Sequence, residues 1–135
     1  LTRQHKGDQP VTEAQRIERM LGIANDVVGI TKNWKIRYVG IRGHAMNAAA
    51  YQVGEVSGVL KTQLYLALKI VSEVVPSIPA HKHVMGQGRP AGHEVVRAVR
   101  DGLGYDAKTP TEAEAAIVAR YLFDKKVAEQ KEVAR

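Results

Sequence analysis

The sequence contains no cysteine, which excludes disulfide bonds, thiolate metal ligands and a cysteine nucleophile. Aromatic residues make up only 5% of the 135 residues, so a hydrophobic core must be built mainly from aliphatic side chains. Long hydrophobic runs are also missing. The longest nearly uncharged stretch, Ala45–Leu60, contains Asn47, Gln52 and Glu55, and we do not expect it to cross a membrane.

Motifs typical of enzymes are scarce as well. The three serines lie in no nucleophile motif, and no pair of carboxylates is placed to divide acid and base roles. His81, His83 and His93 are weak candidates for metal ligands, because they lie in a stretch rich in glycine and proline. The sequence Gly86-x-Gly88 lacks the preceding strand of a dinucleotide-binding loop. We therefore predict that the protein is not an enzyme and has no metal, no cofactor and no small-molecule substrate.

The charge is basic and unevenly distributed. The chain has 20 Lys+Arg against 14 Asp+Glu, a formal net charge of +6. Residues 1–70 hold ten basic and five acidic residues, which is +5 of that total. A one-sided excess of this kind favours a polyanion such as nucleic acid as the partner, and the alternative is an ordinary solvated basic surface.

Residues 1–44 are predicted to form a basic N-terminal arm with a helix-turn-helix-like segment. Thr12 and Gln15 form a capping-box pattern at the start of an amphipathic helix, which we expect to end at Gly29. The next segment, Thr31–Gly43, partly alternates like a strand, but its apolar residues also fit one helical face. Since no partner strand is evident and a single strand is not stable alone, we predict a helix there.

Residues 45–135 are predicted to form a helical bundle. An apolar stripe predicts one long helix over residues 45–75, about 46 Å in length. This exceeds the diameter of about 40 Å for a compact chain of this size. Either the helix breaks near Gly54 and Gly58 or neighbouring subunits cover its end, and we predict the second. Residues 76–92 are predicted to be a loop, and Thr109-Pro110 to start the last helix. The predicted fold class is therefore all-α, with an N-terminal helical arm, a long helix and a C-terminal helical bundle.

Basic residues spread along helices, without an aromatic platform, favour contact with the nucleic-acid backbone over reading of its sequence. Two small residues of the long helix would let a sugar–phosphate surface approach, although the same small-residue line also suits packing against another helix. The predicted DNA-binding residues are Arg16, Arg19, Lys32, Lys35, Arg37, Arg42, His44, Gly54, Gly58, Lys61 and Lys69.

The run Lys32–Arg42, the small-residue helix over residues 45–75 and the capped helix from Thr109 together resemble the major coat proteins of filamentous and rod-shaped archaeal viruses with double-stranded DNA, of the rudivirus, lipothrixvirus and tristromavirus type. The resemblance implies a structural nucleocapsid protein of the virion that wraps A-form double-stranded DNA in a helical filament, assembled in the host cytoplasm. It also implies partners: copies of the chain itself and a second, related coat protein in a heterodimer. An outer lipid envelope is left open.

Other functions fit the same residues. A small helical subunit of a ribonucleoprotein complex, such as a CRISPR effector small subunit or a ribosomal protein, would share the basic helical face but bind RNA. A helical adaptor that binds only protein would use its small-residue line against a partner helix. The two classes differ in salt dependence, because only nucleic-acid binding releases counterions.

Overall fold

The computed structural model describes residues 10–43, 50–86 and 92–134. In chain order the elements are α2 (Glu13–Asn33), β1 (Gly40–Arg42), α3 (Ala50–Leu68), β2 (Glu73–Val75), α4 (Ser77–Met85), α5 (Gly92–Leu103) and α6 (Pro110–Val133). Within these three ranges, no helix is both long and apolar enough to cross a membrane. Residues 1–9 and 44 of the predicted arm lie outside the described residues, and so do residues 45–49 of the predicted long helix.

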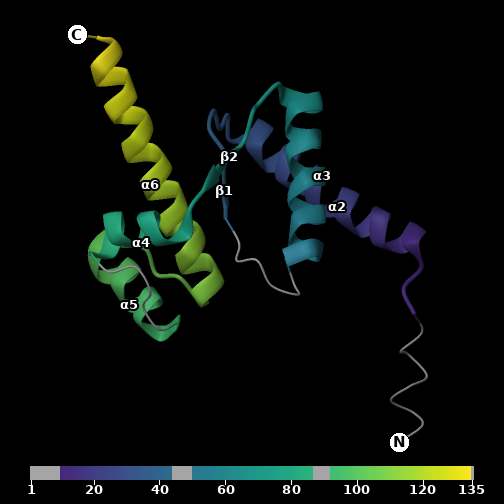
Figure 1. The fold of residues 1–135 in the computed structure, drawn as a ribbon, viewed down its shortest axis with the longest axis horizontal. Coiled ribbons are helices and arrows are strands. Elements are labelled where there is room, and N and C mark those ends of the chain that lie inside the picture. Colours follow the sequence, from purple (N-terminus) through teal and green to yellow (C-terminus); the bar gives the residue numbers. More distant parts are fainter. Residues whose placement is uncertain (1–9, 44–49, 87–91, 135) are drawn as a thin grey trace, which may run out of the picture.

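A small parallel sheet lies between two groups of helices. β1 and β2 pair in parallel, with Gly40 opposite Glu73 and Arg42 opposite Val75. Helices α2 and α3 pack against each other on one side of the strands, and α4, α5 and α6 gather on the other (Figure 1). The predicted all-α fold is therefore wrong, because the chain runs helix–strand twice and has an α/β architecture.

Both helices that precede a strand end at a lysine in the left-handed conformation. Lys35 has φ 54° and Lys69 has φ 57°. After each lysine the chain turns back, and the amide of Ile36 donates to the carbonyl of Thr31 at 2.9 Å. Glycine is the usual residue at this position of a helix end, so the sequence gives no signal for either stop. Both predicted helix ends were therefore wrong. Helix α2 continues four residues past Gly29, and the helix predicted over residues 45–75 ends at Leu68.

The loop predicted over residues 76–92 contains helix α4. Pro76 is the residue before the helix, and Pro79 lies in its first turn, where a backbone amide has no partner within the helix. Gly86, with φ 81°, ends the helix in the left-handed conformation. The prolines therefore permit the helix rather than break it, and the prediction of a loop here was wrong.

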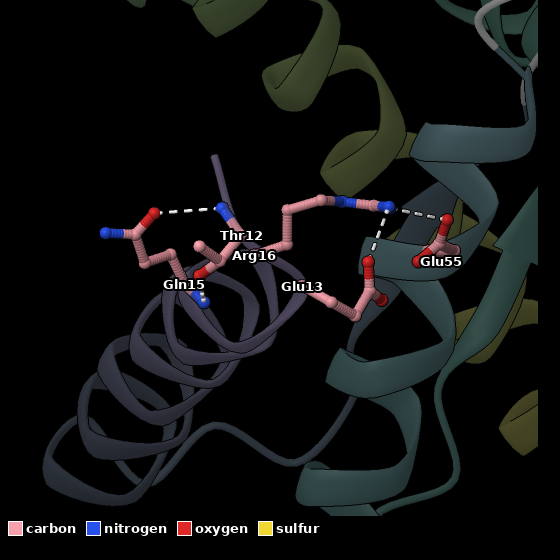
Figure 2. Close-up of polar contacts among 5 residues, drawn as sticks. All are labelled: Thr12, Glu13, Gln15, Arg16 and Glu55. Carbon is pink, nitrogen blue, oxygen red and sulfur yellow. Dashed lines mark hydrogen bonds and ion pairs between the residues drawn. The ribbon is translucent and has the colours of Figure 1, made fainter. Parts of the chain in front are cut away.

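The helix starts read from local patterns are confirmed. Thr12 Oγ1 accepts from the amide of Gln15 at 3.1 Å, and the Gln15 side chain accepts from the Thr12 amide at 2.9 Å (Figure 2). Thr109 caps α6 by accepting from the amide of Glu112 at 3.2 Å, and Pro110 follows it at the first helical position. Each cap satisfies amides that the first helical turn leaves without a partner.

The core is aliphatic, as the composition predicts. It lies between α4, α5, α6 and β2, and its buried members are Val75, Ala80, Val95, Val99, Ala107, Ala113, Ile117 and Val118. On the other side of the strands, Leu64 of α3 and Ala24 of α2 are also almost fully buried. The contact between β1 and α6 is close-packed, because a β-carbon at Gly40 would lie 3.1 Å from side-chain atoms of both Val118 and Val75.

Gly40→Val is expected to lower the free energy of unfolding by about 1–3 kcal/mol, because the added atoms overpack the contact between β1 and α6. The matched glycine variant is Gly58→Ala on α3, where an added β-carbon meets nothing within 4 Å. Gly58→Ala should instead stabilise the protein by up to about 1 kcal/mol through helix propensity. Urea unfolding of both variants tests this; equal effects would contradict the packing assigned to Gly40.

An ion pair also joins β2 to α6. Lys126 Nζ lies 2.7 Å from Glu73 Oε2, and this hydrogen bond holds the pKa of Glu73 below its ordinary value. Lys126→Met should raise the pKa of Glu73, as measured by NMR titration. The wild-type chain gains stability from the pair at neutral pH and loses it as pH falls through the lowered pKa of Glu73, whereas the variant lacks this component. Lys131→Met, at the end of α6, is the control, and a Glu73 pKa unchanged in Lys126→Met would contradict the pair.

Candidate functional site

The carboxyl ends of the two parallel strands meet at one edge of the sheet, and polar side chains gather there. Arg42 is the last residue of β1, while β2 leads through Pro76 directly into α4, whose first residue is Ser77. The first turns of α6 lie beside them and supply Glu114. In α/β folds, ligands bind in the crevice outside the carboxyl ends of parallel strands.

Four side chains make this cluster, which we call the Arg42 cluster: Arg42, Ser77, His81 and Glu114. The Arg42 Nε donates to Ser77 Oγ at 3.1 Å and lies 3.8 Å from Glu114 Oε2. On the other side of the same carboxylate, His81 Nε2 lies 2.6 Å from Glu114 Oε2. The cluster therefore links β1, α4 and α6 through one carboxylate oxygen.

The cluster runs from a buried end to an exposed end. The His81 side chain is 7% exposed, that of Glu114 is 16% exposed and that of Arg42 is 53% exposed. The second ring nitrogen of His81, Nδ1, is buried and has no hydrogen-bond partner within the part of the chain that the structure describes. The Arg42 guanidinium can thus contact a ligand in solution, while His81 holds the Glu114 carboxylate from its buried side.

The start of α4 adds a second feature that suits an anion. No side chain caps this helix, because the residue before it is Pro76. Helix N-termini present amide donors and the positive end of the helix dipole, and both favour a phosphate or carboxylate group. Arg42 contacts Ser77, the first residue of that helix, so a cation and a helix N-terminus lie together. This arrangement can bind an anion at the strand ends.

The residues do not make a metal centre. Over residues 10–43, 50–86 and 92–134, no three His, Asp or Glu side chains are grouped to hold an ion. Two of the histidines considered from the sequence pair instead with separate carboxylates, His81 with Glu114 and His83 with Asp124 at 2.7 Å. The hydrogen bond from His83 holds the pKa of Asp124 below its ordinary value.

The DNA-binding residues predicted from the sequence are distributed over several parts of the molecule. Arg16 lies on α2 and pairs with Glu13 at 3.2 Å and with Glu55 of α3 at 2.7 Å (Figure 2). Arg19 and Lys32 are exposed on α2. The charge of Arg16 therefore serves contact between two helices, while Arg19 and Lys32 face solvent.

The remaining predicted residues lie at the helix ends that precede the strands, along α3 and on the chain that forms β1. Lys35 and Lys69 lie at the helix ends that precede the strands, and Lys61, Gly54 and Gly58 lie along α3. Arg37 follows Lys35 in the extended segment and stacks 5.9 Å from the ring centre of Tyr38. Only Arg42 reaches the carboxyl ends of the strands, and His44 lies outside the described residues.

Sequence reasoning missed Glu114 and considered His81 only as a weak candidate for a metal ligand. A signal for Glu114 exists, because it precedes Val118 and Leu122 at intervals of four residues, and both of these are buried on α6. A carboxylate in line with the buried face of a helix needs a partner, since burial of an unpaired charge is costly. No comparable signal marks which histidine supplies that partner.

Comparison with known proteins shows a likeness in fold. No family model and no curated protein matches the sequence. Among solved structures, the chain is similar to RuvC of Thermus thermophilus, a Holliday junction resolvase with an α/β nuclease fold, at a TM-score of 0.65 and 21% identity. The match covers 84% of this chain and 68% of RuvC. At this identity, the likeness shows a shared fold.

This likeness overturns the predictions drawn from the coat-protein resemblance. The neighbour is a nuclease with an α/β fold, so the predictions of a coat protein in a helical filament and of a ribonucleoprotein subunit are wrong. The prediction that the chain is not an enzyme is corrected in the same way. Nothing supports coat-protein copies, a heterodimer or an envelope as partners. The predictions failed because the segments of both strands also fit a helical pattern, so the sequence did not indicate two short strands that pair in parallel.

Removing the carboxylate of Glu114 should destabilise the protein through His81. Glu114→Ala leaves a buried ring nitrogen without an acceptor, and we expect a loss of about 1–3 kcal/mol in the free energy of unfolding. Glu114→Gln keeps an acceptor oxygen and should cost less. Urea unfolding of both variants, with the exposed Glu132→Ala on α6 as the control, measures the difference. An Ala variant as stable as the control would refute the pairing.

Proposed function

We propose that this protein binds double-stranded DNA and hydrolyses its phosphodiester backbone at the Arg42 cluster. The observation that carries the proposal is the position of this cluster, at the carboxyl ends of parallel strands in a fold shared with a DNA-processing nuclease. The basic charge supports the same partner, because a net charge of +6 favours a polyanion.

A backbone phosphate fits the exposed end of the cluster. The Arg42 guanidinium is planar and can donate two hydrogen bonds to phosphate oxygens. The start of α4 lies beside it and favours the same charge, with the amides of Ser77 and Ile78 as donors, because Pro76 and Pro79 have none. Such contacts bind the phosphate without reading the bases, so we expect affinity for many DNA sequences.

The buried end of the cluster supplies a base. Both contacts of Glu114 end on Oε2, so Oε1 can accept a proton from the water that attacks the phosphorus. The new P–O bond forms as the bond to the leaving sugar oxygen breaks, and that oxygen takes its proton from solvent. Arg42 neutralises the charge that grows on the phosphate in the transition state, and His81 orients the carboxylate.

Many nucleases use two divalent ions held by carboxylates. The Arg42 cluster has one carboxylate, and its Oε2 atom is already shared between His81 and Arg42. The residues of this cluster therefore do not fit a two-metal site, and the proposed step uses only the protein groups.

Binding and cleavage are tested separately on a four-way DNA junction and on a duplex. We expect log affinity to fall linearly with log salt concentration, because phosphate contacts release counterions. Arg42→Gln should weaken binding roughly tenfold or more, the usual effect of losing a charge-assisted hydrogen bond. Fluorescence anisotropy over a salt series measures this, and Arg97→Gln, an exposed arginine on α5, is the matched control.

Glu114→Gln should bind both DNAs with nearly wild-type affinity but cleave neither, as followed by denaturing gel electrophoresis. The folded state of the variant is checked by its unfolding curve. If the wild-type chain fails to bind either DNA at low salt, the proposed function is wrong. If Arg97→Gln weakens binding as much as Arg42→Gln, the assigned position of the phosphate is wrong.

A further inference from the structure

A groove of about 820 Å³ runs beside β1 and reaches Arg42 and Glu114 at the carboxyl ends of the strands. Along its base lies the chain from residues 36 to 42, which ends in strand β1. One wall is the end of α2, with Val27 and Ile30, and the other is α6, with Val118 and Phe123. The groove is therefore a slot along a strand, with a helix on each side.

On the side that faces the groove, the backbone N–H and C=O groups of β1 have no partner strand among the described residues. The Glu73 amide donates to the Val39 carbonyl and the Gly43 amide donates to the Val75 carbonyl, so the odd-numbered residues of this strand face β2. Backbone groups alternate in direction along a strand, and those of Gly40 and Arg42 therefore face the slot. Among the described residues, β1 pairs only with β2.

The walls of the slot are apolar and unusually accessible. Ile30 is 55% exposed and Phe123 is 62% exposed, although both face the groove. Parallel strands normally occur in sheets that helices cover on both faces, and a sheet of two strands is only marginally stable. Helices already stand on both sides of the slot, so a further strand would complete this arrangement.

Size and charge restrict what can enter. A volume of about 820 Å³ holds a few residues of extended chain but not a whole folded domain. The charged residues that line it are three cations, Arg37, Arg42 and Lys126, and one anion, Glu114. The occupant should therefore be apolar at alternate positions and carry a carboxylate.

We propose that the edge of β1 that faces the groove binds an extended, partly acidic strand of a partner protein. The strand would pair with the backbone of Gly40 and Arg42 and cover Ile30 and Phe123. The groove shares Arg42 and Glu114 with the Arg42 cluster, but this inference rests on the backbone edge of β1 and not on the chemistry at Glu114.

The test uses the isotope-labelled 135-residue chain and a synthetic peptide that alternates valine and threonine around one aspartate. In the chain alone, the amides of Gly40 and Arg42 should exchange with solvent faster than the Ile41 amide. Excess peptide should slow exchange at Gly40 and Arg42 at least tenfold. A peptide with alternate N-methylated amides, which cannot donate to the edge, should leave both rates unchanged.

Phe123→Lys should abolish the effect of the peptide, because it places a charge on the apolar wall. Val133→Lys, on the same helix and 88% exposed, should not. The proposal is overturned if both peptides act alike or if neither slows exchange. It is also overturned if the two amides are protected without peptide in proportion to protein concentration, since a second copy then covers the edge. DNA binding by the Phe123→Lys variant is measured in parallel, so failure here is distinguishable from failure of the proposed function.

Discussion

The pairing of β1 with β2 is the contact on which the rest of the structure depends. Each strand has only three residues, so the pair is held by what packs on it rather than by its own hydrogen bonds. Val75 is buried against α6, and Gly40 has no side chain, which lets Val118 approach the strand closely. Because the strands are parallel and in register, they end together, and this brings Arg42 to the start of α4. The candidate site thus follows from strand direction.

Local signals in the sequence predicted local structure correctly. Thr12 with Gln15, and Thr109 with Pro110, identify two helix starts because each cap involves residues at most three apart. The strands could not be found this way, because Gly40 and Glu73 lie far apart in the chain and each segment alone also fits a helical pattern. The ends of α2 and α3 could not be predicted either, because each is followed by a lysine in the left-handed conformation, where glycine is the usual residue.

The candidate site was predictable only in part, for a related reason. Counting charges indicated a polyanion partner, but the sign of a residue does not reveal its partner in the fold. Arg16 was counted among the DNA contacts, and the structure gives it two carboxylate partners. Arg42 was counted in the same way, and it lies at a helix start beside a carboxylate with a buried histidine behind it. Only the tertiary structure separates a cation that joins two helices from one positioned at a site.

Arg42 connects the two inferences drawn from this structure. Its side chain lies at the carboxyl end of the sheet, whereas its backbone faces the open edge of β1. A strand paired along that edge would fix the backbone from which the guanidinium projects, and a fixed guanidinium loses less conformational entropy when it binds a phosphate. Linkage requires any effect of the strand on anion binding at Arg42 to be matched by an equal effect of the anion on the binding of the strand. The edge and the anion site are therefore separate in chemistry but coupled through one residue of β1.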